Sequence, residues 1–367
     1  MSKPAALFLV GAGPQLHSAR RVSAYLERPA ALLDLWSATV VGLDAGDGAG
    51  HVAPVTVGRL RAVAAAVKSW AAANPGGILV APQDVGLVYR RAIAVGRRSG
   101  LRIALLPDGV VSDGKVTQRS LLGGVVPAAD AVLRSAGLFA GVHGEMAASK
   151  PDLVLSWGPG WDGVYTARGA GRIADVGNPR ADGLDALPAP EGDKLLVCSQ
   201  PTWHAAIGGD PVAAIWYGFL ERLVSGAPQG SVQVRLHPWE RDRLAELPVG
   251  SATRAVLTEG TTFYQDLGWS SSVVSWGSTT MIEAAGARRP IVSVSPNEAA
   301  AELVRGYPFM RDPRMVMVRP DDLPDWPSVL ALLDKARAQQ DGYADDFLVN
   351  VGSASQAAAT ALDEWQD

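Results

Sequence analysis

A histidine and a proline follow an apolar run in the second half of the chain. The run Val232-Gln233-Val234-Arg235-Leu236 is typical of a buried strand, and His237 and Pro238 come directly after it. Because a proline disfavours the helical conformation of the residue before it, we expect His237 to be extended at the end of this strand. An imidazole there could donate a hydrogen bond to a phosphate or transfer a proton near neutral pH. The alternative is a histidine whose ring is satisfied by a backbone carbonyl.

A hydroxyl-rich turn follows another apolar strand, about forty residues further on. The strand Val273-Val274-Ser275 leads into Trp276-Gly277-Ser278-Thr279-Thr280, after which a helical pattern begins. Hydroxyls and free N–H groups at the start of a helix bind phosphate well. The alternative is a capping box of Thr280 and Glu283, which needs no ligand. Since a cap needs one hydroxyl and this turn has three, we favour a phosphate site at Gly277, Ser278 and Thr279.

Two segments in the first half of the chain could serve the same chemistry. Asp108 follows the strand Arg102–Leu106 within Leu105-Leu106-Pro107-Asp108-Gly109, and could act as a general base for an acceptor hydroxyl. The alternative is a structural Pro-Asp-Gly turn. Gly13, Pro14 and Gln15 follow the first strand and could meet an acceptor or donor, although Pro14 and a missing glycine spoil a dinucleotide fingerprint. A plain β–α turn is the simpler interpretation of this loop.

Three further side chains complete the candidates. His143 stands in a likely loop before Gly144 as a candidate second catalytic imidazole, with a surface histidine as the alternative. Trp203 follows the strand Leu195–Cys198 and could stack on a base, whereas Cys198 itself is expected to be a core thiol. No two histidines have the spacing of a helical zinc pair, so we expect neither a metal nor a cofactor.

Composition restricts the classes of function. The chain has 367 residues and a net charge of −4, with no basic stripe that would bind nucleic acid. Its single cysteine excludes an intramolecular disulfide and fits a reducing cytoplasm. The first apolar run is too short for a signal peptide, and no run approaches the length of a membrane span. Peripheral membrane contact and the oligomeric state stay open.

The elements that must position these residues alternate along the chain. Apolar runs separated by helical patterns predict α/β architecture with mainly parallel sheets covered on both faces. The stretch 176–193, rich in proline and glycine, interrupts the alternation and indicates a linker. The expected strands are Leu7–Val10, Ala38–Gly42, Ile78–Val80, Arg102–Leu106, Asp152–Leu155, Leu195–Cys198, Val232–Leu236, Val273–Ser275 and Ile291–Val294, and the expected helices include Leu60–Ala73, Gly86–Arg98, Ala213–Ser225, Thr280–Gly286, Asn297–Arg305 and Ser353–Trp365.

The order of elements predicts two Rossmann-like domains that face each other across a cleft. The first domain, residues 1–180, is expected to bind the acceptor, and residues 194–350 are expected to bind the nucleotide. Residues 181–193 would be the linker. Residues 351–367 would form a helix that packs back on the first domain.

These motifs, in this order, resemble those of bacterial sialyltransferases and polysialyltransferases, enzymes of the GT-B fold. The resemblance rests on His237-Pro238, on Ser278-Thr279-Thr280, on the opening Gly13–Leu16 and on Asp108-Gly109, where Pro107 replaces the first acid of that group's acid-acid-glycine motif. It implies that Asp108 is the base, that His237 contacts the donor phosphate or acts as acid, and that Ser278 and Thr279 hold the nucleotide phosphate.

A second group has much of the same pattern. The glycerol-phosphate polymerases of teichoic acid synthesis and their capsule-synthesis relatives also have the His-Pro strand end and the Ser/Thr turn, and His143-Gly144 is similar to their His-Gly pair. The segment from Lys150 to Arg180 is similar to theirs and to nucleotide-sugar 2-epimerases. This resemblance implies a polyol-phosphate transferase in which His143 and His237 are the working pair.

Taken together, the sequence predicts a cytoplasmic bacterial glycosyltransferase of polysaccharide biosynthesis. It would transfer a sugar from a nucleotide-activated donor, with CMP favoured and UDP or CDP as alternatives, to a hydroxyl of a carbohydrate or small-molecule acceptor. The alternatives are a CDP-glycerol-type polyol-phosphate transferase, a nucleotide-sugar epimerase, and a non-catalytic protein that binds a nucleotide-sugar.

Overall fold

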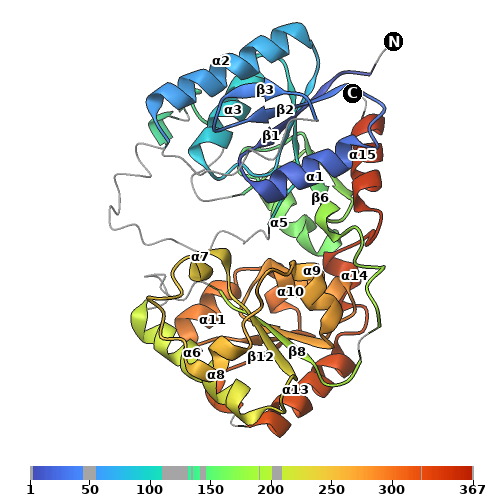
Figure 1. Ribbon diagram of the computed structural model, residues 1–367. Coiled ribbons are helices and arrows are strands. Elements are labelled where there is room, and N and C mark those ends of the chain that lie inside the picture. Colours follow the sequence, from blue (N-terminus) through green and yellow to red (C-terminus); the bar gives the residue numbers. More distant parts are fainter. Residues whose placement is uncertain are drawn as a thin grey trace. The chain divides into compact units, whose positions relative to one another are not determined.

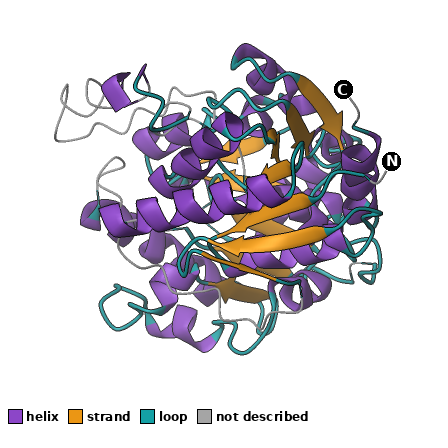
Figure 2. Ribbon diagram, turned by 90° about the horizontal axis from the view of Figure 1, so that it is seen from above, coloured by secondary structure: helices purple, strands orange, loops and turns teal. Residues whose placement is uncertain are grey.

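The computed structural model describes residues 3–43, 55–109, 131–133, 135–140, 146–189, 191–200, 209–323 and 325–365. The chain divides into two compact units. Unit 1 comprises Met1–Asp182 and Val349–Asp367, and unit 2 comprises Gly183–Leu348. Each unit is built on one sheet with helices packed around it (Figures 1 and 2).

Seven strands form the sheet of unit 1 in the order β3-β2-β1-β4-β5-β6-β7. All neighbours are parallel except β2 and β3, which are antiparallel. Strands β1, β4 and β6 are buried along their whole length, as expected for central strands that are covered on both faces. The strands are β1 Ala6–Val10, β2 Ala30–Asp34, β3 Thr39–Val41, β4 Ile78–Ala81, β5 Arg102–Leu105, β6 Leu153–Ser156 and β7 Arg172–Asp175.

Helix α2 of unit 1 buries one face, whereas α3 is buried on most sides from Val88 to Gly96. In α2, Val63, Val67 and Ala71 are spaced by four residues and buried, while most of the remaining surface is exposed. The helices are α1 Gly13–Ser23, α2 Val57–Ala73, α3 Leu87–Arg98, η1 Pro159–Trp161, α5 Asp162–Ala167, η2 Pro179–Ala181 and α15 Ala354–Glu364.

Unit 2 has a five-stranded sheet in the order β12-β11-β10-β8-β9, with every pair parallel. Its strands are β8 Leu195–Cys198, β9 Val232–Arg235, β10 Ser272–Ser275, β11 Ile291–Val294 and β12 Val316–Val318. Its helices are α6 Asp210–Gly226, α7 Pro238–Arg241, α8 Ser251–Ala255, α9 Phe263–Trp269, α10 Thr279–Gly286, α11 Glu298–Val304, α12 Pro308–Arg311, η3 Pro320–Asp322, α13 Trp326–Gln339 and α14 Tyr343–Phe347.

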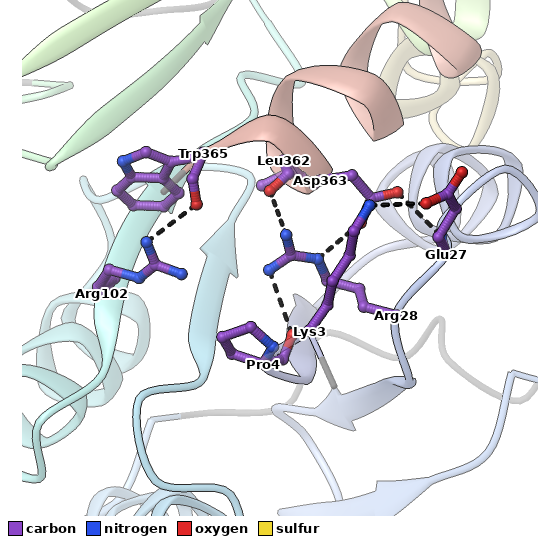
Figure 3. A network of polar contacts seen from close by, with 8 residues as sticks. All are labelled: Lys3, Pro4, Glu27, Arg28, Arg102, Leu362, Asp363 and Trp365. Atoms are coloured by element: carbon purple, nitrogen blue, oxygen red, sulfur yellow. Dashed lines mark hydrogen bonds and ion pairs between the residues drawn. The ribbon is translucent and has the colours of Figure 1, made fainter. Parts of the chain in front are cut away.

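The last helix, α15, returns to unit 1. Ala358, Ala359 and Leu362 belong to the same buried cluster as β1 and β4. A polar network fixes the end of the helix (Figure 3): Arg28 Nε donates to Asp363 Oδ1 at 2.8 Å, and the same guanidinium donates to the carbonyls of Pro4 and Leu362. The predicted packing of a C-terminal helix on the first domain is confirmed.

Most expected strands are confirmed within one or two residues, and the mainly parallel α/β fold with them. The sequence analysis missed three strands, β2, β7 and β12. Of these, β7 and β12 lie at sheet edges, where only one side pairs and the apolar run is short. The segment expected as Ala38–Gly42 forms β3, which is an antiparallel edge strand.

The start of the expected linker is packed into unit 1. Asn178 is 1% exposed and caps η2, and Arg21 donates to the carbonyls of Pro179 and Asp182. Gly177 has φ +85°, and a Cβ there would lie 2.2 Å from the carbonyl oxygen of Val349. The close approach of these two segments therefore requires glycine.

Candidate functional site

The candidate residues of unit 1 lie where its strand order reverses. Strand β1 pairs with β2 on one side and β4 on the other, and in open parallel sheets ligands bind beyond the carboxyl ends of strands at such a point. Gly11 and Gln15 follow β1, Asp108 follows β5, and Tyr89 comes from α3 after β4. The structure brings the side chains of Gln15, Tyr89 and Asp108 together.

Gln15 is the centre of this group. Its carbonyl Oε1 accepts from Gly11 N at 2.8 Å and from Tyr89 OH at 2.7 Å, so its amide Nε2 is the atom that faces Asp108. Nε2 donates to Asp108 Oδ2 at 2.6 Å. Gln15 is 4% exposed, and these three bonds fix the amide in one orientation. Gln15 therefore holds the Asp108 carboxyl through one oxygen, Oδ2.

Asp108 is prepared for proton transfer. Burial raises the pKa of its carboxyl, and the hydrogen bond from Gln15 and the charge of Arg180 lower it in part. The cavity behind the carboxyl, lined by Gln15, Ser18 and Asp108 among others, measures only about 10 Å³. That volume is too small for anything larger than a water molecule. Any group larger than water must therefore reach Asp108 from its half-exposed side.

Gln15 and Asp108 were identified from the sequence, but the glycine that packing requires in this loop is Gly11 and not Gly13, whose contact with a ligand stays a prediction. A Cβ on Gly13 would meet nothing within 4 Å, whereas a Cβ on Gly11 would lie 2.3 Å from the Tyr89 hydroxyl. Gly11 is therefore the residue that lets the Tyr89 phenol reach Gln15. Pro14 is exposed in the first turn of α1. Tyr89 itself was missed, because only the fold brings α3 beside this loop.

In unit 2 the strand order reverses at β8, between β9 and β10. His237 follows β9 and Ser278 follows β10, so the two segments flank the carboxyl end of β8 on either side. Neighbouring strands lie about 4.8 Å apart, so two strands on either side of a third are separated by about 10 Å. Both segments are tied to β8: Ser199 donates to Glu240 in α7, and Ser275 donates to the carbonyl of Cys198 at 2.7 Å.

His237 is extended, as predicted, with φ −58° and ψ 144°. It is also the N-cap of α7, and its Nδ1 accepts from Trp239 N at 3.3 Å. Burial lowers the pKa of the imidazole, so the ring is neutral at pH 7. A neutral ring whose Nδ1 accepts must carry its proton on Nε2. His237 therefore offers an Nε2–H donor, and its ring is satisfied by a backbone N–H rather than by a carbonyl.

Two residues near His237 were missed. Glu240 is 0% exposed, and its Oε2 accepts from His237 N at 2.9 Å. The spacing of three residues is that of a capping box, with histidine in the place of serine or threonine, and this signal could have identified Glu240. Trp239 is 54% exposed and has the Arg243 guanidinium 4.7 Å from its ring centre, so it offers an indole face beside the histidine.

The hydroxyl turn caps α10 in a different way from the one expected. Ser278, not Thr280, is the N-cap: its Oγ accepts from Thr280 N at 3.3 Å and from Thr280 Oγ1 at 2.8 Å. The capping box of Thr280 and Glu283, the alternative interpretation of this turn, is therefore wrong. The favoured interpretation counts the Ser278 hydroxyl as surplus to capping, and this is also corrected, because Ser278 is the cap; Glu283 is buried at 3% exposure within the helix. Thr279 is the first helical residue. The Trp276 indole Nε1–H is buried and has no hydrogen-bond partner among the described residues.

Gly277 shapes this turn. It has φ +74°, and a Cβ there would lie 2.2 Å from Val304 Cγ1. We expect Gly277→Ala to combine strain at positive φ with a clash, and to destabilise unit 2 by more than about 1 kcal/mol. Urea unfolding measures this, with Gly226→Ala as control, because a Cβ on Gly226 meets nothing within 4 Å. Equal midpoints for both variants would contradict the prediction.

Two sequence candidates, His143 and Trp203, lie outside the described residues. Within the described part of the chain, no three His, Cys, Asp or Glu side chains form a group that could hold a metal ion. No helix in that part is both long and apolar enough to cross a bilayer.

Comparison with known proteins finds similarity in structure only. No protein-family model and no curated protein matches the chain. Among solved structures, a Listeria monocytogenes protein described as a UDP-N-acetylglucosamine 2-epimerase matches with a TM-score of 0.59 and 14% identity, over 100% of this chain and 98% of that one. The wall teichoic acid polymerase TagF matches with a TM-score of 0.59 and 14% identity, over 98% and 89%.

A third match is the UDP-GlcNAc 2-epimerase of Neisseria meningitidis bound to UDP-GlcNAc, with a TM-score of 0.56 and 11% identity over 98% and 99% of the two chains. The chain has a GT-B type fold. At these identities the likeness establishes the fold alone. The predicted pair of Rossmann-like domains is confirmed, whereas the likeness to sialyltransferases gains no support from these comparisons.

Proposed function

We propose that this chain is a transferase that moves a group from a nucleotide-activated donor to an acceptor hydroxyl. The observation that carries the proposal is the pair of donor-bearing segments, His237 and the turn at Ser278, on either side of β8 at the strand-order reversal of unit 2. In open α/β sheets this is where ligands bind.

The groups at this edge suit a nucleotide phosphate. His237 offers Nε2–H. The start of α10 offers the Thr279 N–H, because Thr280 N and Met281 N already donate to Ser278. The Trp276 indole N–H is buried without a partner among the described residues. Each is a donor, and a helix N-terminus adds a favourable dipole for an anion. The same donors would stabilise the charge that grows on a phosphate as it leaves.

Unit 1 supplies the base of the proposed reaction. The ionised oxygen of Asp108 that Gln15 does not occupy takes the proton of the acceptor hydroxyl. The acceptor oxygen then forms a bond to the transferred group, and the bond from that group to the nucleotide's phosphate oxygen breaks. The electron pair of that bond stays on the nucleotide. This balance holds whether a sugar carbon or a polyol phosphate is transferred.

The structural neighbours favour polyol phosphate or a UDP-linked sugar over the CMP-linked sialic acid expected from sequence. TagF is a wall teichoic acid polymerase, and the epimerase from Neisseria meningitidis was solved with UDP-GlcNAc. Asp84 argues against an epimerase, which needs several carboxylates that can act on the substrate. Asp84 follows β4 and is the second carboxyl of this region besides Asp108. It is fully buried and accepts from Ala147 N and Ser149 N, so both of its oxygens are used.

A thermal-shift panel of CMP, CDP, UDP and GDP tests the donor site. CDP or UDP is expected to raise the apparent stability with concentration, by about 2.7 kcal/mol at 100 times Kd. His237→Ala and Ser278→Ala should each reduce that shift. Ser328→Ala is the matched control. Ser328 bonds Asp325 at the start of α13, which lies beside the first residues of β8 and β10. This is the other end of the strands from His237 and Ser278, so the variant should leave the donor site unchanged.

Product analysis then distinguishes the donors. Release of CMP from CDP-glycerol indicates transfer of polyol phosphate, release of UDP from UDP-GlcNAc indicates transfer of sugar, and formation of the 2-epimer would make the chain an epimerase. If no nucleotide raises the stability, or if the His237 and Ser278 variants respond like the wild type, the proposed donor site is wrong.

A further inference from the structure

A buried carboxylate stands directly behind His237. Glu240 is 0% exposed, and its two oxygens together accept three hydrogen bonds, each from a different segment of unit 2. Oε1 accepts from Tyr217 OH at 2.5 Å and from Ser199 Oγ at 2.9 Å, while Oε2 accepts from His237 N at 2.9 Å. Ser199 Oγ in turn accepts from Trp216 Nε1 at 2.8 Å. Glu240 thereby connects β8, α6 and the loop after β9.

Packing alone gives no reason for a carboxylate here. Trp216 and Tyr217 are large, buried and surrounded by apolar side chains of α6, and a buried charged group generally costs more stability than an apolar group of similar volume. An apolar side chain could accept none of the three bonds. The donors on Tyr217 and Ser199 are side-chain hydroxyls that apolar residues could also replace, whereas the backbone N–H of His237 would remain and need an acceptor. The bond from that N–H joins the buried network to the residue that the proposed function places on the donor phosphate.

Helix α7 cannot hold His237 by itself. It has only four residues, Pro238–Arg241, and a helix of that length is not stable alone. Its start is fixed by the reciprocal bonds of the capping box, from Trp239 N to His237 Nδ1 and from His237 N to Glu240 Oε2. Because Trp239 N donates to Nδ1, the neutral imidazole carries its proton on Nε2. The bond from His237 N to Glu240 Oε2 holds the backbone conformation that lets the first bond form.

We propose that Glu240 is a positioning residue for His237, which anchors the loop to β8 and α6 and so keeps the imidazole Nε2–H directed at the donor phosphate. The inference rests on the proposed function for its catalytic meaning. The structural part of the inference is that Glu240 controls the tautomer of the His237 ring, and this part can be tested without any substrate.

The network also predicts a pH dependence. Burial raises the pKa of Glu240 to about 6, while the bonds from Tyr217, His237 and Ser199 lower it in part. Among the described residues, the titratable ones that bond to Glu240 are Tyr217 on α6, through its hydroxyl, and His237 on its own loop, through its backbone N–H. Because the folded-state pKa is raised, the folded state binds more protons than the unfolded chain between pH 4.5 and about 6, and stability falls as pH rises through that window.

Tyr217→Phe is the most informative variant, because it removes one donor to the carboxylate and keeps the ring. Loss of this bond raises the pKa of Glu240 further, so the acidic limb of the pH–kcat profile should move to higher pH. Tyr343→Phe is the matched control: Tyr343 OH is also buried in unit 2 and donates to the carbonyl of Phe309 at 2.8 Å. It should lower stability without moving the limb.

Glu240→Ala and Glu240→Gln separate positioning from folding. Glu240→Ala leaves His237 N without its acceptor and should lower kcat by about 100-fold, the order of effect that a displacement of about 1 Å can have, with less change in KM. Glu240→Gln can turn its carbonyl to His237 N and should recover most of the loss. If Glu240→Ala keeps wild-type kcat, or if the limb moves equally in both tyrosine variants, the inference is wrong.

Nitrogen-15 NMR of the imidazole in the substrate-free protein separates this inference from the proposed function. The wild type and Glu240→Gln should show His237 as the neutral Nε2–H form at pH 7.5, and Glu240→Ala should show a mixture of tautomers. If the His237 tautomer depends on Glu240 but the protein transfers no group, the proposed function is wrong and the positioning role stands. An active enzyme whose ring is unchanged in Glu240→Ala would refute the positioning role alone.

Discussion

Replacing Asp108 by asparagine is expected to lower kcat by about 10²- to 10⁴-fold, the usual contribution of a general base. Asparagine can keep the hydrogen bond from Gln15 Nε2, which in the wild type is 2.6 Å long, but its amide takes no proton. Burial raises the pKa of Asp108, so wild-type kcat/KM should rise with pH as this carboxyl ionises, and the variant should lose the contribution of Asp108 to that rise and keep the contribution of Glu240.

Stability measurements exclude unfolding as the cause of that loss. The raised pKa means that the folded state binds extra protons at Asp108, so ionising it costs stability as pH rises above its ordinary range. Asp108→Asn should therefore be at least as stable as the wild type at pH 8. Asp175→Asn is the matched control, since Asp175 ends β7, two strands from β5, and burial raises its pKa as well. Its kcat should stay near that of the wild type; wild-type kcat in Asp108→Asn would remove Asp108 from the mechanism.

The parts of the fold that could be predicted are those whose signal is local. Central strands such as β1, β4 and β8 are continuous apolar runs, because a parallel strand covered on both faces has no polar side. The edge strand β7, Arg-Ile-Ala-Asp, carries charges at both ends and is exposed there, so it has no such run. The edge strand β12, Val-Met-Val, is apolar but has only three residues, which is too short a run to identify as a strand.

The candidate site divides in the same way. Gln15, His237 and Ser278 could be found because each directly follows a strand in the sequence. Tyr89 and Ser199 could not, because their roles depend on which strands are neighbours: α3 meets the loop after β1, and β8 lies between β9 and β10. Strand order is set by long-range pairing, which no short motif records.

Glu240 is an intermediate case. Its spacing from His237 is a capping signal in the sequence, whereas no local pattern indicates that its side chain is buried. The pattern predicts a bond to His237 N, whereas the contacts with Tyr217 and Ser199 arise from α6 and β8. Those tertiary contacts turn an ordinary cap into a buried carboxylate with a raised pKa. A local motif therefore identifies the residue, and only the fold shows what it can control.

Replacing Asp363 by alanine is expected to destabilise unit 1 by about 3–5 kcal/mol, the cost of leaving a buried charge without its partner. The side chains of Arg28 and Asp363 are 1% and 7% exposed, and Asp363 accepts from Arg28 Nε at 2.8 Å and from Glu27 N at 2.9 Å (Figure 3). Urea unfolding followed by hydrogen exchange of the α15 amides measures the effect, and exchange in α15 should increase most.

The position of this pair explains why its loss should matter for the whole unit. The chain leaves unit 1 at Asp182 and returns at Val349, so α15 belongs to unit 1 through its packing, through this network at its end, and through Asp182, which accepts from Ala354 N and Ser355 N at the start of the helix. Arg28 precedes β2 and Pro4 precedes β1, so the network lies at the amino ends of the strands. Asp108 lies at the opposite, carboxyl ends. The variant should therefore weaken folding while nucleotide binding by unit 2 persists.

Glu27→Gln provides the matched control for that experiment. Lys3 and Glu27 form an ion pair of 2.7 Å beside the buried one, but their side chains are 35% and 75% exposed. An exposed pair contributes at most about 1 kcal/mol, so this variant should unfold close to the wild type and lose its small effect in high salt. Replacing Arg28 and Asp363 together by methionine and leucine should restore much of the stability, because no buried charge is then left alone. If Asp363→Ala unfolds at the same urea concentration as Glu27→Gln, the buried pair does not hold α15 in place.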